Sequence, residues 1–245
     1  MQTCRRRMNV VLVFAGLLLA TCGDDDGGGA TADDQEIADE AIAAVEQALR
    51  DDGFTASPDD EDDDDLPFQS EECRKFQEVA FQASDQGLPG ETARAESGAF
   101  ERGMVEPTDG VEETVEAGVT FVEEPEDVDP LFELLNDERL GPCLEEALRV
   151  ALEEDAAEGQ EAVELRNLET EQLGVDGLGD AGAGIQGTAE ITSSGVTFLF
   201  SFTDQFVRVN RAVLALSTVA VGTEEPTADR AALLEILVDG VSDQD

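Results

Sequence analysis

The chain has 245 residues, with 59 acidic side chains, 14 basic ones and a formal net charge of −45. This charge excludes nucleic acid as a ligand, because proteins bind nucleic acid by neutralising its phosphates with lysine and arginine. The sequence has no histidine, which excludes Ser-His-Asp and Cys-His catalysis and the common histidine-bearing zinc sites. We therefore expect a protein that is not an enzyme and that holds neither a metal nor another cofactor.

Residues 1–21 predict an export signal. Three arginines at 5–7 precede the apolar segment Val10–Ala20, which at 1.5 Å per residue is too short to cross a hydrocarbon core of about 30 Å. The following Leu19-Ala20-Thr21-Cys22 resembles a bacterial lipobox. This resemblance implies cleavage before Cys22, acylation of its sulfur with palmitate-type chains, and attachment to the extracytoplasmic face of the cell membrane. Thr21 stands where the pattern usually has glycine, alanine or serine, so a secreted protein without lipid stays open.

The chain after the signal predicts a tether at 22–33 and a single extracytoplasmic domain at 34–245. Glycine makes the stretch “GDDDGGGA” flexible, and its aspartates keep it solvated. No linker interrupts the rest of the chain. An acidic loop at 51–67 contains the run “DDEDDDD”, which lacks the ligand spacing and the glycine of an EF-hand and is interpreted as solvated chain.

Apolar spacing predicts both helices and strands in the first part of the domain. Segment 34–50 has an apolar stripe at helical spacing. Ser70 is placed to cap a second helix that runs to about residue 83. Strands are predicted at 99–105 and 115–122. Two further helices are predicted to begin at Asp129-Pro130, with Asp129 as the N-cap, and at Gly141-Pro142.

The last third predicts three strands, at 185–191, 196–209 and 212–221, and a closing helix at 227–241. The preceding “GLGDAGAGIQG” lacks the lysine of a P-loop and is interpreted as a loop. In the middle strand Phe198, Phe200 and Phe202 share one face. Such a stripe is typical of a core, and it is also the best candidate wall for an apolar ligand.

The predicted fold class is α+β, because an antiparallel sheet with helices packed on it is the simplest way to bury these apolar faces. Four cysteines are present. Cys4 leaves with the signal and Cys22 belongs to the lipobox, so Cys73 and Cys143 remain. Outside the cytoplasm two such cysteines usually form a disulfide, although two free buried thiols stay open.

Three short motifs suggest a family. They are Pro130-Leu131-Phe132 with Cys143-Leu144, then Gly179-Asp180, then the pattern “FVRV-x-R-x-V” at 206–213. Their order resembles actinobacterial secreted lipoproteins and the extracellular sensor domain of PknH-type receptor kinases. More distantly it is similar to LpqN-type lipoproteins, which have a PsbP/Mog1-like α/β sandwich. This chain departs in having no tryptophan and in having Asn210 where the hairpin usually has glycine.

The resemblance implies an extracytoplasmic binding or sensing module, with an unidentified envelope ligand or protein partner and no catalytic residues to carry over. Two alternatives stay open. The first is a carrier of an apolar small molecule or lipid behind Phe198, Phe200 and Phe202. The second is an envelope hydrolase that works with carboxylates alone, which needs two carboxyls about 5–9 Å apart in a cleft, one of them with a raised pKa.

Overall fold

The computed structural model describes residues 32–57, 70–71, 73–74, 76, 88–103, 110–157, 164–175, 177–193, 196–222 and 227–242. The predicted signal, the tether up to residue 31 with Cys22, and residues 58–67 of the acidic loop lie outside these residues. Among the helices that are described, none is long and apolar enough to cross a membrane.

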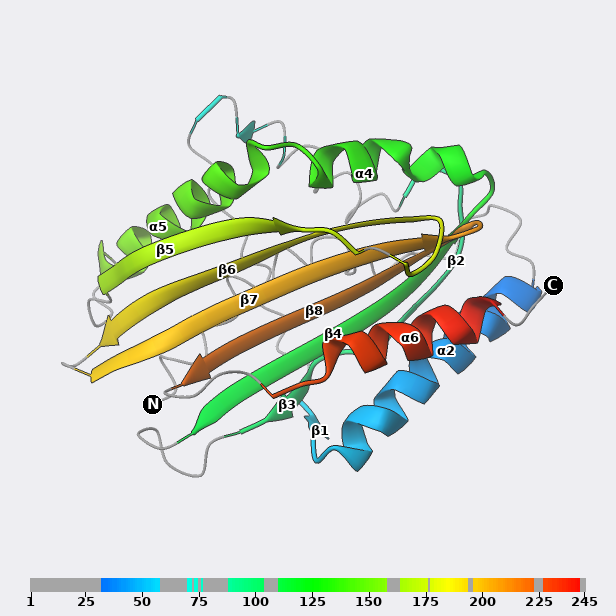
Figure 1. Ribbon diagram of the computed structural model, residues 1–245, viewed down its shortest axis with the longest axis horizontal. Helices are drawn as coiled ribbons and strands as arrows, with labels where there is room; N and C mark the ends of the chain where they lie inside the picture. Colours follow the sequence, from blue (N-terminus) through cyan, green and yellow to red (C-terminus); the bar gives the residue numbers. More distant parts are fainter. Residues whose placement is uncertain are drawn as a thin grey trace.

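Helices and strands alternate irregularly along the chain (Figure 1). The helices are α2 (Ala32–Asp51), the 3₁₀ helix η1 (Pro125–Val128), α4 (Asp129–Leu135), α5 (Leu140–Ala157) and α6 (Arg230–Ser242). The strands are β1 (Thr55–Ala56), β2 (Glu91–Glu96), β3 (Phe100–Arg102), β4 (Val111–Val122), β5 (Glu164–Leu173), β6 (Ala181–Ser193), β7 (Val196–Val209) and β8 (Ala212–Gly222).

The domain is built on one antiparallel sheet of eight strands. Seven of them follow the order β1-β3-β4-β8-β7-β6-β5, and the eighth, β2, pairs with β4 beside β3. The long central strands of the sheet pair without interruption, from Phe121 opposite Ala212 to Val111 opposite Gly222 in β4 and β8. The short strands β2 and β3 share the outer edge of β4: β2 pairs with its second half and β3 with its first half. The sheet therefore has a continuous centre with a divided edge.

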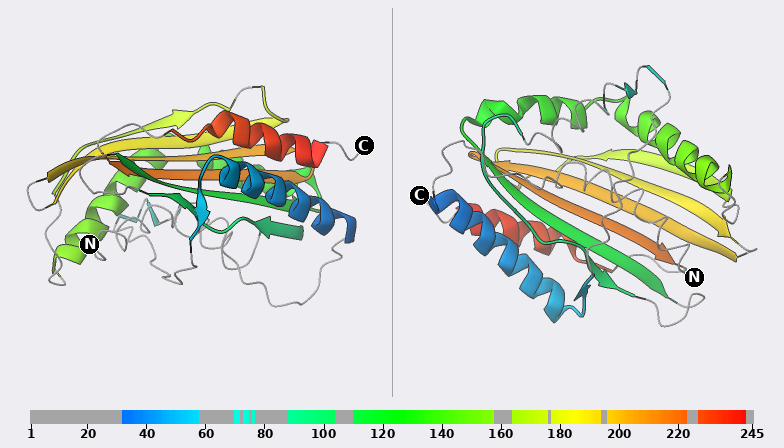
Figure 2. Two further views of the ribbon diagram at one scale, coloured as in Figure 1. Left: turned by 90° about the horizontal axis from the view of Figure 1, so that it is seen from below. Right: turned by 180° about the vertical axis from the view of Figure 1, so that it is seen from behind.

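Helices cover both faces of this sheet, and each face has its own core. On the α2–α6 face, α2 and α6 pack over Val115, Ala117, Val119 and Phe121 of β4 and over Leu214 and Leu216 of β8. On the α4–α5 face, α4 and α5 pack over Phe200, Phe202 and Phe206 of β7. Figure 2 shows α6 and α5 on opposite sides of the sheet. The predicted α+β fold, an antiparallel sheet with helices packed on it, is confirmed.

Several expected boundaries are corrected. Asp129 is the first residue of α4 and Val128 occupies the N-cap, because η1 runs directly into this helix. A short strand, β1, lies in the segment expected to be the acidic loop. The strands β2 and β5 were not predicted. The side chains described in β5 are exposed or half-exposed, so this edge strand lacks an apolar period-two pattern.

The glycine-rich stretch is the clearest correction, because β6 begins at Ala181 and Gly182, Gly184 and Gly187 lie inside the strand. A Cβ on Gly187 would lie 2.1 Å from the ring of Phe202 on the neighbouring β7, and one on Gly184 would lie 2.7 Å from the Asp204 carbonyl oxygen. Glycine is needed here for the close approach of β7, not for a turn.

Candidate functional site

A row of polar side chains crosses the α4–α5 face of the sheet. We call it the polar strip and define it by Glu91, Arg94 and Glu96 of β2, Glu116 and Thr120 of β4, Ser217 of β8 and Asp204 of β7. The pairing places Arg94 opposite Thr120, Glu116 opposite Ser217, and Ser217 opposite Asp204. Because side chains alternate along a strand, these residues share the face opposite the α2 contacts.

The outer part of the strip is an arginine between two carboxyls. Arg94 Nη2 lies 2.8 Å from Glu91 Oε2, and Arg94 Nη1 lies 3.5 Å from Glu96 Oε1. A register shift between Glu91 and Ala93 brings Glu91 onto the face that carries Arg94. The Arg94 side chain is 9% exposed, whereas those of Glu91 and Glu96 are 24% and 31% exposed. The two acids form the accessible rim of the strip.

The pKa of Glu96 is raised to about 7. Burial of the carboxyl is the main cause, the guanidinium of Arg94 opposes it, and the charge of Glu91 adds to it. Glu96 lies opposite Gly118, so no side chain of β4 at that position covers it. Glu96 is therefore an exposed acid at the rim whose raised pKa favours its protonated form more than that of an ordinary glutamate.

The inner end of the strip is a single buried acid. Asp204 is 1% exposed, and its Oδ1 accepts a hydrogen bond of 2.7 Å from Ser217 Oγ. Its Oδ2 has no hydrogen-bond partner. Burial raises the pKa of Asp204 to about 7, and the Ser217 hydrogen bond opposes this shift only in part. A carboxyl so placed is neutral or charged at neutral pH according to small changes in its surroundings.

The sequence held a signal for Asp204 that the prediction missed. In “FLFSFTDQF” this aspartate has the same parity as Phe198, Phe200, Phe202 and Phe206, so it had to share their buried face. The members of the strip on β2 carried no comparable signal, because that strand was itself not predicted.

The phenylalanine wall lies next to Asp204 in the core of the α4–α5 face. Phe200 and Phe202 are 4% and 3% exposed, and their ring centroids are 6.0 Å apart. Phe198 is partly buried and packs against the same cluster. The phenylalanine wall and Asp204, the inner end of the polar strip, therefore lie side by side in the α4–α5 core.

The predicted Cys73–Cys143 disulfide is present, with the two Cα atoms 5.3 Å apart. It ties the segment that begins at Ser70 to α5. Ser70 Oγ accepts a hydrogen bond from the Cys73 amide at 3.2 Å, as expected of a helix cap. Both cysteines lie in the α4–α5 core.

The “FVRV-x-R-x-V” motif forms the end of the β7–β8 hairpin and fastens helices to the sheet. Arg208 Nη1 lies 2.8 Å from Asp129 Oδ1 of α4, and Arg211 Nη2 lies 2.9 Å from Asp34 Oδ1 of α2. Asp180 Oδ2 accepts a hydrogen bond from the Asn210 amide at 2.7 Å. Asn210 has φ of +53°, a conformation that asparagine tolerates. The motif thus has a structural role, and asparagine replaces glycine without loss of the turn.

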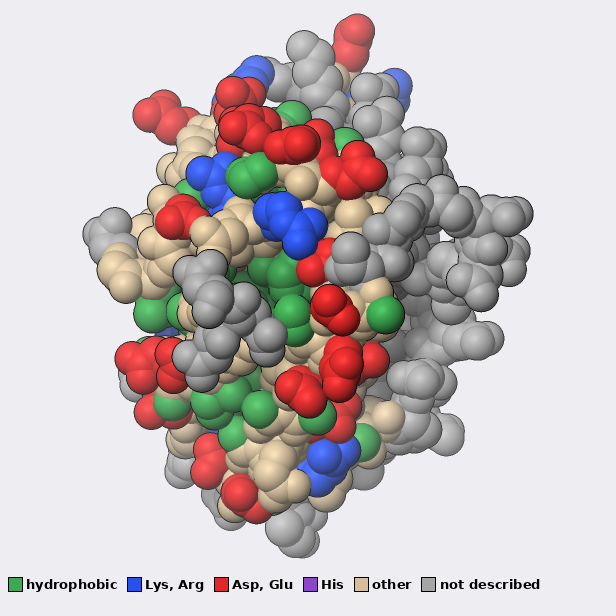
Figure 3. Space-filling model, turned by 90° about the vertical axis from the view of Figure 1, so that its right-hand side faces the viewer, with side chains coloured by type: hydrophobic (Ala, Val, Ile, Leu, Met, Phe, Trp, Pro, Cys, Tyr) green, Lys and Arg blue, Asp and Glu red, His purple; other side chains and the backbone are tan. Residues whose placement is uncertain are grey.

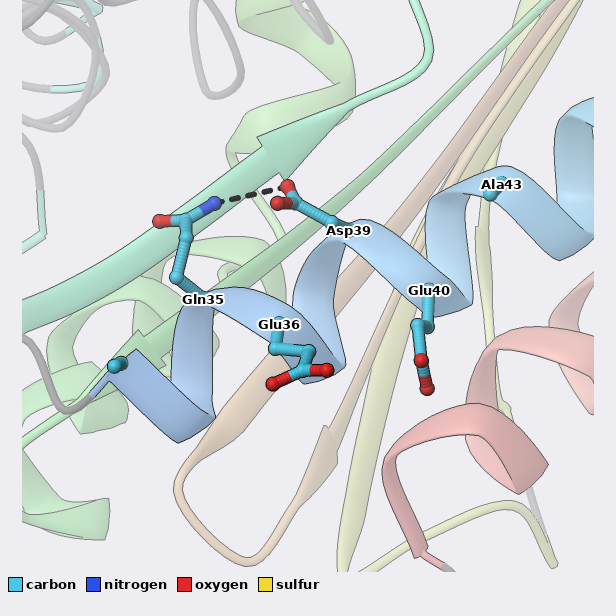
Figure 4. A pocket seen from close by; sticks show the side chains of 6 residues that line it. Gln35, Glu36, Asp39, Glu40 and Ala43 are labelled. Atoms are coloured by element: carbon cyan, nitrogen blue, oxygen red, sulfur yellow. Dashed lines mark hydrogen bonds between the residues drawn. The ribbon is translucent and has the colours of Figure 1, made fainter.

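A shallow hollow beside α2 is lined by Ala32, Gln35, Glu36, Asp39, Glu40 and Ala43. Figure 4 shows Gln35 turned toward Asp39, to which it donates a hydrogen bond of 3.0 Å. The Gln35 amide also donates to the Arg94 carbonyl oxygen at 2.7 Å. Because every lining residue that is described belongs to one helix, the hollow lacks the converging walls of a ligand site.

Within the part of the chain that the structure describes, no three acidic or cysteine side chains gather closely enough to hold a metal ion.

No protein-family model and no curated protein matches the chain. The solved structures that are similar to it include the following two. The crystal structure of LpqN, involved in cell envelope biogenesis of Mycobacterium tuberculosis, is 12% identical, with a TM-score of 0.29 over 80% of this chain and 92% of that one. PA94 of Pseudomonas aeruginosa, a protein of unknown function and putative regulator, is 14% identical, with a TM-score of 0.21 over 51% of this chain and 68% of that one. With TM-scores of 0.29 and 0.21, neither likeness carries an argument about fold or function.

Proposed function

We propose that the protein is a lipid-anchored, extracytoplasmic binding protein without enzymatic activity, and that its ligand contacts the polar strip. The observation that carries this proposal is the rim of the strip, where Glu91 and Glu96 present partly exposed carboxyls on either side of Arg94. Such a group offers acceptors and a donor in fixed positions, which suits recognition of a polar ligand or protein segment.

The position and attachment of the first helix, α2, support a lipid anchor at Cys22. The first residue of α2, Ala32, follows Cys22 by ten positions, so the intervening chain reaches about 35 Å at most. The first turn of α2 is fixed to the sheet, because Asp34 accepts hydrogen bonds from Arg211 and from Thr92. Acidic side chains crowd this end of the molecule (Figure 3). Since they do not attract anionic lipid headgroups, a covalent lipid is the anchor that suits this end.

A carboxylate-based hydrolase is the second candidate, and Glu96 is the observation that favours it. This acid has a pKa raised to about 7, as a general acid needs, and a second carboxyl lies on the same face. The guanidinium of Arg94, however, contacts both carboxyls. It lies where a glycosidic bond has to enter between an acid and a nucleophile, and this favours binding over hydrolysis.

Native mass spectrometry of the protein extracted in detergent from its own host tests the proposal. We expect a retained polar adduct on the wild type and on the control Glu235→Gln, whose side chain is exposed on α6. The variant Glu96→Gln should lose at least tenfold in adduct occupancy. A bare wild-type mass would contradict ligand binding at the strip and favour a protein partner, whereas an apolar adduct would favour the carrier. Hydrolysis of glycan or ester substrates that Glu96→Gln abolishes would overturn the non-enzymatic assignment.

A further inference from the structure

We propose that Asp204 makes the α4–α5 face responsive to pH: with a neutral carboxyl the face is closed, and with an ionised carboxyl it loosens. The geometry points to this because Asp204 is 1% exposed at the centre of the sheet, and its Oδ2 has no hydrogen-bond partner. Its strand pairs continuously with β6 and β8, so Asp204 cannot leave the core without disturbing that pairing. This property is independent of any ligand.

The described surroundings of Asp204 hold no compensating charge. Its neighbour across β6 is Ile185, its neighbour across β8 is Ser217, and on its own strand Phe202 and Phe206 flank it. From β4, Glu116 is the nearest titratable residue on this face, one strand beyond Ser217. It is an acid, so it brings no positive charge to Asp204.

The acids and bases of the covering helices whose side chains are described are engaged elsewhere or exposed. On α5, Glu145 accepts a hydrogen bond from Thr170, and Glu146 accepts one from the Ser70 amide. Arg149 of the same helix is exposed, as is Glu133 of α4. The described residues that these helices turn toward the core are apolar, together with the disulfide.

These surroundings set the direction of the effect. A neutral carboxyl carries no charge and costs much less to bury in an apolar core, whereas a carboxylate with one donor is strongly disfavoured there. Accordingly burial raises the pKa of Asp204 to about 7 from its usual 3.8. The folded state therefore holds a proton that the unfolded state has released, so this stabilisation is complete below about pH 4 and is lost as pH rises to about 7. Ionised Asp204 gains solvation when the helices of this face admit water.

Urea unfolding at pH 5, 6, 7 and 8 tests the proposal, with circular dichroism as the probe because the chain has neither tryptophan nor tyrosine. The unfolding constant of the wild type, divided by that of Asp204→Asn, should rise about tenfold per pH unit between pH 5 and 7 and level off above it. In parallel, amide exchange in α5 and β7, corrected for intrinsic rates, should rise with pH in the wild type but not in Asp204→Asn.

Asp239→Asn is the matched control, since it removes an equal charge from an exposed position on α6. It should keep the wild-type pH dependence. Should Asp204→Asn fail to fold, Ser217→Ala takes its place: without the hydrogen bond from Ser217, the one donor to this carboxylate among the described residues, the transition should move to higher pH. A ratio that does not change with pH, or a transition that Ser217→Ala leaves unmoved, would overturn the proposal.

Discussion

Glu113 and Asp204 are both buried carboxyls of the same sheet, yet their surroundings shift their pKa in opposite directions. Burial alone would raise the pKa of Glu113, but hydrogen bonds from Arg102 and from the amides of Thr227 and Ala228 lower it below its usual value. These contacts join β3 and β4 to the chain that leads into α6. Among the described residues, the Ser217 hydroxyl is the one group that donates a hydrogen bond to the carboxyl of Asp204. The number of hydrogen-bond donors that face a buried acid thus decides the direction of its pKa shift. With several donors the acid stays charged and holds elements together, and with one donor its charge depends on pH.

Glu113→Gln should destabilise the domain by about 2–4 kcal/mol at pH 7, because it leaves the charge of Arg102 without its partner. The depressed pKa of Glu113 gives stability that is present above its usual value of 4.5 and is lost as pH falls through the folded pKa. The difference between variant and wild type should therefore shrink at low pH. Urea unfolding at pH 7 and pH 3.5 measures this, with Glu235→Gln as the exposed control. A difference that grows at low pH would contradict the assignment.

Gly187→Ala should destabilise the domain by about 1–3 kcal/mol through overpacking. The added methyl would meet the Phe202 ring, whose Cε1 lies 2.1 Å from the ideal Cβ position. Gly103→Ala is the control, because nothing lies within 4 Å of its Cβ position. Thermal unfolding followed by circular dichroism compares the two. Equal melting temperatures for both variants would show that the Phe202 ring is not packed on Gly187.

At the scale of elements, the β7–β8 hairpin connects the two faces of the sheet. Arg208 reaches α4 on one face, and Arg211 reaches the first turn of α2. Asp34 is 5% exposed, so the guanidinium of Arg211 offsets part of the cost of burying its charge. The hairpin motif is therefore explained by helix attachment, without any contact to a ligand.

Arg211→Ala should release the start of α2 and destabilise the domain by about 1–3 kcal/mol. This is less than for a fully buried pair, because the Arg211 side chain is 39% exposed. Hydrogen exchange should rise at residues 32–38 and stay unchanged in α5. Arg211→Lys should recover only part of the protection, since a single ammonium group replaces Nη2, which donates to Asp34, and Nη1, which donates to the Val122 carbonyl oxygen. Unchanged exchange in α2 would contradict this role.

The sequence predicted those elements whose apolar period is regular. In β4 the alternation of Val115, Ala117, Val119 and Phe121 gave both the strand and its buried face, and the stripe of α2 did the same for the first helix. The edge strands β2 and β5 were not predicted, because edge strands carry charged and polar side chains that give no such apolar alternation. The rim of the polar strip lies on β2, so three of the seven residues of the candidate site were missed with that strand, whereas the position of Asp204 along β7 indicated its buried face.

At the scale of the whole molecule, one sheet separates two hydrophobic cores, and different helices cover each core. Two long helices, α2 and α6, close the α2–α6 core and contact each other. The α4–α5 core contains the disulfide and the buried acid. The oxidising surroundings that a disulfide needs agree with the export signal predicted from residues 1–21. An anchor at Cys22 would hold the start of α2 nearest the membrane.

The most direct test of the account is the mass of the N-terminal peptide from protein extracted from the host membrane. A lipid-anchored protein should yield a peptide that begins at Cys22 and carries a diacylglyceryl group. With Cys22→Ser, the protein should leave the membrane fraction while its circular dichroism spectrum stays unchanged. A wild-type peptide that begins elsewhere, or an unmodified Cys22 on protein that still sediments with membranes, would contradict the lipid-anchored assignment.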